Sequence, residues 1–339
     1  MHFIDNKGIT CEFTMFIFNF LFLKNFVFLQ IMSPIYFSVV LPAYNTPPDI
    51  LRRAIDSVLN QTYPYFELII VDDGSTPSLE TIVSEYKDER IVFIRHTQNR
   101  GAGAAHNTGI KEAKYDWIAF ICHDDEWLPN KLEVCVPYIE QNYPQYKFFF
   151  HLPIVLGEED EIKDLPFYTP TTLKTGNYYR NYLLNFDRII QTSTIIVHIE
   201  CFEKYGYYDE SGALIDWDIY LRFSKYIDFY CINKLLSKYY FTSLGITHFH
   251  NNSNSKIAGN NLFKFYYKWE KEIKVNKEAN KYWLLRWNSF AIGYLEINKP
   301  LEALRSFWAS IKLNPFWRGN YIDILKNLPK IIKLMITNK

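Results

Sequence analysis

The stretch FICHDDEWLPNKLE, from Phe120 to Glu133, joins an apolar run to two adjacent carboxylates, Asp124 and Asp125. The apolar run predicts a buried strand, and Pro129 predicts the first turn of a helix soon after the acids. Adjacent carboxylates repel each other, and each raises the pKa of the other. The pair therefore needs a partner at the tip of this strand.

Strands and helices alternate on both sides of this stretch. Apolar, β-branched runs predict four strands, at residues 36–42, 66–75, 90–96 and 116–121. A helix follows each strand, at residues 49–61, 78–87, 101–113 and 129–142. This order predicts a mostly parallel α/β sheet covered by helices on both faces. Beyond it, the pattern predicts strands at residues 147–156 and 192–198 and a helix at residues 215–226.

The composition limits the class of partner. The chain has 339 residues and a formal net charge of +0, and no polybasic run indicates a nucleic-acid partner. Its five cysteines lack the Cys-x-x-Cys spacing of zinc sites. A reducing cytosol therefore fits this chain better than a disulfide framework.

The N-terminal segment admits two interpretations. Residues 13–32 approach the roughly 20 apolar residues that cross a bilayer, but Asn19, Lys24, Asn25 and Gln30 interrupt the run. One interpretation is a hydrophobic membrane anchor. The other, which we favour, is that Met32 is the true start, because the first strand begins almost directly after it. Residues 1–31 are then a misassigned extension.

Polar residues follow three of the predicted strands at their carboxyl ends, where parallel sheets bind ligands. These segments are PAYN (42–45), DDGS (72–75) and HDDE (123–126). Asp73 could accept a hydrogen bond from a nucleobase or a ribose, or the acids could form a turn that caps a helix. Asp124 and Asp125 could hold Mg²⁺ or Mn²⁺, which prefer oxygen ligands, or form a solvated acidic loop.

The segment NRGAGAAHNTG, residues 99–109, starts with glycines and becomes helical. Backbone N–H groups at such a helix start can approach a phosphate, or the glycines can allow tight helix packing. The segment is not a P-loop, because no Gly-Lys-Ser/Thr follows. Both interpretations stay open on this segment alone.

Four segments taken in order, SVVLPAYN, ILRRAIDSVLNQTYPYFELIIVDDGST, NRGAGAAHNTGI and DDEWLPNKLE, resemble the N-terminal half of glycosyltransferase family 2. The resemblance is close from Ser38 to Glu133 and weaker as far as Ser253. It implies a GT-A, Rossmann-like fold and an inverting enzyme that uses a nucleotide sugar. The GT-A domain would span residues 32–255, divided into a nucleotide-sugar half (32–145) and an acceptor half (146–255). Residues 256–339 would form a helical C-terminal region.

The resemblance implies roles for residues of the first half. Nucleotide-sugar binding would fall to Pro42, Tyr44, Asn45, Asp73, Asn99, Arg100 and Asp124. Asp73 would contact the base and Asp124 the ribose and diphosphate, while Asp125 would coordinate Mn²⁺ or Mg²⁺. Two positions depart from the family pattern. Cys122 stands where the metal motif often has a first acid, and His106 stands where the family often has Arg.

In the second half, LIDWDIYLRF resembles the family's acidic motif. Asp216 falls on the position of the catalytic base, with Asp218 as the fallback, and Ile215 replaces a common acidic neighbour. From the residues alone, Asp216 could also be the N-cap of the helix that follows. In THFHNNSNS, the resemblance places His250 on the diphosphate or the metal.

These features together imply transfer of a sugar to a saccharide or lipid-linked saccharide, in bacterial surface polysaccharide or glycan assembly. The departures leave open a non-catalytic nucleotide-sugar-binding protein. A nucleotidyltransferase is a weaker alternative, because PAYN is neither Gly-rich nor basic. The expected location is the cytoplasm. The lysine-containing tail, residues 321–339, admits peripheral contact with the inner face of the plasma membrane, although we favour an ordinary amphipathic surface helix.

Overall fold

The computed structural model describes residues 34–157, 173–184, 190–211, 214–240, 263–296 and 298–337. All the elements below belong to the compact unit that begins at Phe37. The predicted N-terminal extension and the loop that holds His250 lie outside the described residues.

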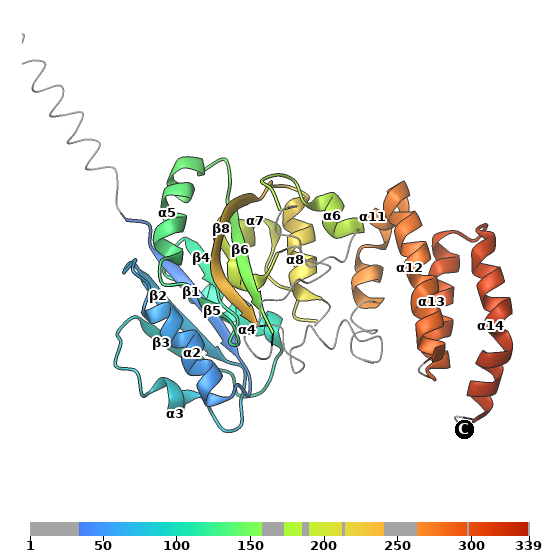
Figure 1. Ribbon diagram of the computed structural model, residues 1–339, viewed down its shortest axis with the longest axis horizontal. Coiled ribbons are helices and arrows are strands. Elements are labelled where there is room, and N and C mark those ends of the chain that lie inside the picture. Colours follow the sequence, from blue (N-terminus) through green and yellow to red (C-terminus); the bar gives the residue numbers. More distant parts are fainter. Residues whose placement is uncertain are drawn as a thin grey trace, which may run out of the picture. The chain divides into compact units, whose positions relative to one another are not determined.

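An eight-stranded sheet with the strand order β3-β2-β1-β4-β7-β6-β8-β5 forms the centre of this unit (Figure 1). Its strands are β1 Phe37–Ala43, β2 Phe66–Asp72, β3 Ile91–Arg95, β4 Trp117–Phe120, β5 Glu126–Trp127, β6 Phe148–Leu156, β7 Ile195–His198 and β8 Tyr230–Tyr240. The four strands predicted in the first half, β1 to β4, are parallel neighbours. All residues of β1 and β2 are buried, which requires cover on both faces. The predicted mostly parallel α/β fold is confirmed.

The second half of the sheet adds antiparallel pairs. β7 lies between β4 and β6 and is antiparallel to both. β6 and β8 are parallel, and the short β5 is antiparallel to β8. The sequence pattern predicts β7 as a strand but not its neighbours, because these partners are distant in the chain.

Helices connect and cover the strands. They are α2 Pro48–Leu59, α3 Glu80–Val83, α4 Ala102–Lys111, α5 Lys131–Asn142, α6 Tyr179–Leu184, α7 Glu200–Tyr205 and α8 Ile215–Ser224. The helix predicted at residues 78–87 shortens to α3. Beyond it, Glu85 pairs with Arg52 at 2.8 Å and the Tyr86 hydroxyl donates to Asp56 at 2.9 Å, so contacts with α2 override local helix propensity.

Two glycines of residues 99–109 allow close packing of α4. A Cβ on Gly103 would lie 2.8 Å from the Asp209 carbonyl oxygen. A Cβ on Gly109 would collide with the side chain of Val40, so α4 lies directly on β1. The tight-packing interpretation therefore holds for both glycines, and the close approach at Gly109 sets the position of α4 beside the strand ends.

The C-terminal region is helical, as predicted. It contains α11 Glu270–Val275, α12 Lys277–Glu296, α13 Pro300–Leu313 and α14 Arg318–Thr337. Trp283 and Trp287 of α12 are buried in the same apolar core as the helices of the α/β part. The indole of Trp283 donates to the Leu183 carbonyl of α6 at 3.1 Å. Among the described residues, no helix is both long and apolar enough to cross a membrane.

We expect His151→Leu to reduce the acid sensitivity of the fold. His151 in β6 is 1% exposed, and its Nδ1 donates to the Leu152 carbonyl at 3.1 Å. Burial is the main cause that lowers the pKa of His151 well below 6.5. The unfolded chain therefore takes up a proton that the folded state excludes, and the free energy of unfolding falls as pH drops from about 6.5 toward the lowered pKa.

Urea unfolding at about pH 8 and about pH 5 measures this loss of unfolding free energy. One such group contributes up to about 1.4 kcal/mol of the loss per pH unit. The difference in unfolding free energy between variant and wild type at about pH 8 gives the part of the substitution's effect that does not depend on pH. His151→Leu should lose less stability between the two conditions than the wild type. An equal loss in both proteins would contradict the assignment.

Candidate active site

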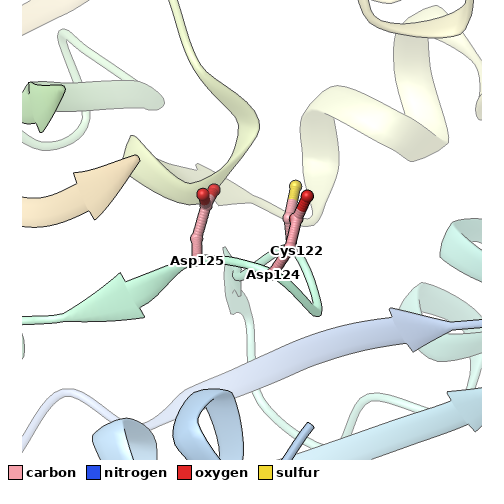
Figure 2. A group of neighbouring side chains, drawn as sticks. All are labelled: Cys122, Asp124 and Asp125. Carbon is pink, nitrogen blue, oxygen red and sulfur yellow. The ribbon is translucent and has the colours of Figure 1, made fainter. Parts of the chain in front are cut away.

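The loop after β4 carries a compact group of candidate metal ligands. One ligand atom from each of Cys122, Asp124 and Asp125 lies within 4.8 Å of the other two. Figure 2 shows the three side chains projecting from this one loop. Asp125 is 1% exposed, while Cys122 and Asp124 are half-buried. The two predicted acids therefore lie together, and Asp124 is the more accessible.

Asp125 is held by groups from the second half of the sheet. The Ser193 hydroxyl donates to one of its oxygens, and the Tyr240 N–H donates to the other at 3.3 Å. The same hydroxyl accepts the Cys122 N–H at 2.9 Å. Burial, and after it the charge of Asp124, raises the pKa of Asp125 well above its usual range. A cation beside the pair would oppose both effects.

The backbone carbonyl of Ser193 is occupied as well. It accepts hydrogen bonds from the Trp127 indole at 3.0 Å and from the Lys131 ammonium at 2.8 Å. Lys131 is fully buried, lies 3.4 Å from the centroid of the Trp127 ring, and has its pKa lowered well below the usual value by burial. Ser193 thus joins three elements. Its role could not be predicted from the sequence, because a lone serine carries no pattern.

These residues fit a hard cation through two ligands. Asp124 and Asp125 supply the oxygens that Mg²⁺ and Mn²⁺ prefer, whereas a thiol is a soft ligand. Burial, and then the charges of Asp125 and Asp124, raises the pKa of Cys122 well above its usual value. Cys122 therefore stays a neutral thiol at pH 7. Of the three residues it is the poorest ligand for a hard cation.

Arg53 of α2 also contacts this loop, and the sequence pattern did not mark it as a site residue. Its guanidinium donates to the Asp124 carbonyl at 2.7 Å and lies 3.8 Å from the centroid of the Tyr240 ring. Arg53 therefore fixes the backbone of Asp124 while leaving its carboxylate available.

Asp73, the predicted base contact, is engaged inside the protein. It is 2% exposed, and its carboxylate accepts the N–H groups of Arg100 at 2.9 Å and Gly101 at 2.8 Å. It also bonds His96 Nδ1 at 2.6 Å. An ionised carboxylate offers about four acceptor positions, so these bonds leave room for a further donor. In the structure Asp73 fixes the turn into α4, and its contact with a base stays a prediction.

The other predicted nucleotide-pocket residues of the first loop lie at the end of β1. Pro42 belongs to the strand, and Tyr44 is exposed just beyond it. Asn45 has a positive φ of 47°. Its N–H donates to the Ser75 hydroxyl at 2.9 Å, and its side-chain oxygen accepts the Thr76 N–H at 3.0 Å. These bonds tie the loop after β1 to the loop after β2.

Asn99 and Arg100 lie in the exposed segment before α4. A Cβ on Gly74, which has a φ of +75°, would lie 2.6 Å from the Asn99 nitrogen, so the loops after β2 and β3 touch. The Arg100 guanidinium pairs with Glu210 at 3.2 Å. The predicted residues of three strand ends are therefore neighbours, while their ligand remains a prediction.

Asp216 lies in the first turn of α8, and the N-cap position is Leu214, which makes no side-chain cap bond. The N-cap interpretation of Asp216 is therefore wrong. Its charge is a further cause, after burial and the two neighbouring acids, that raises the pKa of Cys122. The same charge raises the pKa of His106, against the larger lowering effect of burial. Asp216 is thus within electrostatic range of the acidic loop after β4.

His106 is buried at 5% exposure, with its ring centroid 4.6 Å from that of Tyr208. Its Nδ1 donates to the Ala102 carbonyl at 2.8 Å. Burial is the main cause that lowers its pKa, so the ring is neutral at pH 7. A neutral imidazole cannot supply the charge that an arginine would bring to a diphosphate.

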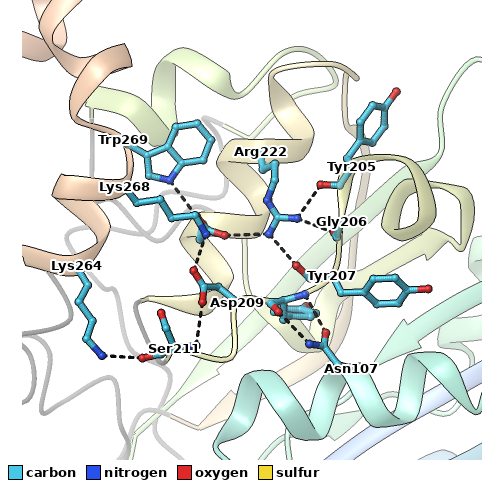
Figure 3. Close-up of polar contacts among 12 residues, drawn as sticks. Asn107, Tyr205, Gly206, Tyr207, Asp209, Ser211, Arg222, Lys264, Lys268 and Trp269 are labelled. Atoms are coloured by element: carbon cyan, nitrogen blue, oxygen red, sulfur yellow. Dashed lines mark hydrogen bonds and ion pairs between the residues drawn. The ribbon is translucent and has the colours of Figure 1, made fainter.

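Asp218, the fallback base, is occupied by structural contacts. Figure 3 labels its three partners, Arg222, Lys268 and Trp269. Its carboxylate is fully buried and pairs with Arg222 at 2.9 Å and with Lys268 at 2.9 Å. The Trp269 indole donates to it at 3.0 Å. These contacts favour Asp216 over Asp218 as the group that faces a substrate.

Residues 38–199 match the family model described as Glycosyl transferase family 2. Through these residues, slightly less than half of the chain, the protein is similar to glycosyltransferase family 2. The fold agrees, because Staphylococcus aureus TarS 1–349 superposes with a TM-score of 0.52 at 17% sequence identity. That match covers 90% of this chain and 92% of TarS 1–349. At this identity the likeness establishes the GT-A fold alone.

Proteins similar to this chain include named biosynthetic enzymes. The amylovoran biosynthesis glycosyltransferase AmsB of Erwinia amylovora is 28% identical over 317 residues, which is 91% of this chain and 100% of AmsB. The UDP-Glc:alpha-D-GlcNAc-diphosphoundecaprenol beta-1,3-glucosyltransferase WfaP of Escherichia coli is 33% identical over 139 residues, which is 41% of this chain and 53% of WfaP. The chain spans less than two thirds of the length of several uncharacterized Rickettsia glycosyltransferases that it also matches.

We expect Ser193→Ala to destabilise the whole protein. The substitution leaves the buried Asp125 carboxylate and the Cys122 N–H each without the hydroxyl that bonds them. An unsatisfied buried group costs about 1–3 kcal/mol, so the free energy of unfolding in urea should fall by at least that amount. Ser237→Ala is a matched control. Ser237 is 1% exposed, and its hydroxyl makes no hydrogen bond within the described residues. Equal losses in the two variants would exclude a special role for Ser193.

Proposed function

We propose that this protein is a member of glycosyltransferase family 2 and transfers a sugar from a nucleoside-diphosphate sugar to an acceptor hydroxyl, with inversion at the anomeric carbon. The observation that carries the proposal is geometric: ligand atoms of Cys122, Asp124 and Asp125 lie within 4.8 Å of one another in the loop after β4. A cation-compatible pair and a separate carboxylate base within one site suit a displacement at a sugar carbon attached to a diphosphate. The match of residues 38–199 to the family model supports the same reaction class.

Asp124 and Asp125 would hold Mn²⁺ or Mg²⁺ in this proposal, and His250 remains a candidate for the diphosphate or the metal. When bound, such an ion neutralises the charge that develops on a leaving diphosphate. Pro42, Tyr44, Asn45 and the other residues assigned to nucleotide binding from the sequence would surround the nucleoside.

In the proposed step, Asp216 accepts the proton of the acceptor hydroxyl while the hydroxyl oxygen forms a bond to the anomeric carbon. The bond from that carbon to the phosphate oxygen breaks, and the nucleoside diphosphate leaves on the opposite face with the bonding electron pair. General-base assistance of this kind contributes about 10²–10⁴-fold. Asp218 is less suited, because Arg222, Lys268 and Trp269 occupy it.

The partners follow from the same proposal. The printed name of WfaP, with a UDP-sugar donor and a lipid-diphosphate acceptor, supports a nucleotide-sugar donor and a saccharide or lipid-linked acceptor here. The AmsB likeness supports a place in bacterial polysaccharide or glycan assembly. A lipid-linked acceptor would place the protein in the cytoplasm, in peripheral contact with the inner face of the plasma membrane.

Release of nucleoside diphosphate from UDP-, GDP- and dTDP-sugars tests this function, with Mn²⁺ or EDTA and with added saccharide acceptors. We expect one donor to be consumed, and EDTA and Asp125→Ala each to abolish the reaction. Asp216→Asn should lower turnover about 10²–10⁴-fold while donor affinity, measured by calorimetry, stays near that of the wild type.

Asp218→Asn is the comparison variant. It weakens buried ion pairs, so it should lower the free energy of unfolding by up to about 3–5 kcal/mol, which Asp216→Asn should not do. Unimpaired turnover in Asp216→Asn would remove Asp216 as the base. Donor binding without release under any condition would favour the non-catalytic alternative.

We expect Cys122→Asp to tighten metal binding. The substitution exchanges a soft neutral thiol for a hard carboxylate beside Asp124 and Asp125. The Mn²⁺ dissociation constant, measured without sugar, should fall about tenfold, equivalent to about 1.4 kcal/mol. Without metal, the third acid should lower Tm through repulsion, so the rise in Tm on adding Mn²⁺ should exceed that of the wild type. Cys122→Ser, which adds no charge, is the control, and equal Mn²⁺ affinity in both variants would show that the ion lies elsewhere.

A further inference from the structure

Helix α14 presents an apolar surface, here named the α14 stripe. It consists of Tyr321, Leu325, Leu328, Ile332 and Ile336. These residues recur every three or four positions, so they share one face of the helix. Their exposure lies between 41% and 69%, which is high for such large apolar side chains. The exposed apolar surface is therefore continuous along the helix.

A different side of α14 packs against the rest of the protein. Asn320 and Ile331 on that face are 0% and 2% exposed. Ile331 belongs to an apolar cluster with Tyr294 of α12 and Phe307 of α13. These contacts fix the rotation of α14 and leave the α14 stripe exposed beside the packed side.

A row of basic side chains borders the α14 stripe. Lys326, Lys330 and Lys333 follow one another at i, i+4 and i+7, and all three are exposed. The helix holds four basic residues and one acid, Asp323. The formal net charge of the whole chain is +0, so this positive charge is a local property of α14.

We propose that α14 lies flat on an anionic lipid surface, with the α14 stripe between the headgroups and the lysine row against them. An apolar face flanked by lysines is what a helix needs to bind at such an interface. At 1.5 Å per residue, its 20 residues would cover about 30 Å of membrane. A second copy of the chain fits less well, because an antiparallel symmetric pairing of this face brings the two lysine rows together.

The proposal specifies the peripheral contact that the proposed function includes, and its test needs no sugar donor. Failure of one is therefore distinguishable from failure of the other. The full chain is mixed with phosphatidylcholine vesicles with and without phosphatidylglycerol, and partition is measured by co-sedimentation. Hydrogen exchange with mass spectrometry then reports protection along the chain, which separates α14 from residues 13–32 as the bound segment.

We expect partition to require phosphatidylglycerol, to weaken with added salt, and to protect the peptides of α14. A lysine near an anionic surface contributes about fivefold in affinity, so Lys326→Gln with Lys330→Gln should lower partition about 25-fold. Lys271→Gln with Lys281→Gln, at exposed positions of α11 and α12, removes the same charge and should change little. Leu325→Gln with Ile332→Gln should weaken partition without lowering Tm, since both side chains are exposed.

Three results would overturn the proposal. The first is vesicle binding that leaves the exchange of α14 unchanged. The second is equal partition of the two double-lysine variants. The third is protection of the α14 stripe that rises with protein concentration in the absence of lipid, which would identify a second copy as the occupant.

Discussion

The candidate site depends on the burial of Asp125 beside the Ser193 hydroxyl. A carboxylate removed from water is costly unless hydrogen bonds replace the water that it loses. Ser193 and the Tyr240 N–H supply those bonds from the second half of the sheet. The loop after β4 therefore keeps its shape only when that half is folded, and the position of Asp124 follows from it.

The pairs Asp72–Asp73 and Asp124–Asp125 have the same sequence pattern but different roles, because their neighbours in the fold differ. At the end of β2, both acids are buried, and backbone N–H groups of Ser75, Arg100 and Gly101 hold them. At the end of β4, only the second acid is buried, while Arg53 binds the first through its carbonyl. The first pair shapes the loops, and the second leaves a carboxylate available for a ligand.

The sequence predicted the parts of the fold that depend on local pattern. Apolar runs located β1 to β4, and the ordered motifs indicated the family. The short α3 and the antiparallel position of β7 were not predictable in this way, because contacts with α2 and pairing with β4 decide them. For the candidate site, the resemblance pointed to Asp124, Asp125 and Asp216, whose roles stay predictions. Ser193, Arg53 and Lys131 act through partners far away in the chain, so no local pattern marks them.

Asp218 makes the C-terminal helices and the α/β part cooperative. Its buried carboxylate is shared by Arg222 of α8 and by Lys268 and Trp269, which lead into α11. Detaching the C-terminal helices would leave that charge with fewer partners inside the protein, at a large cost. These helices are therefore not a removable module. By thermodynamic linkage, whatever stabilises their attachment also stabilises α8, and with it the position of Asp216 two residues away.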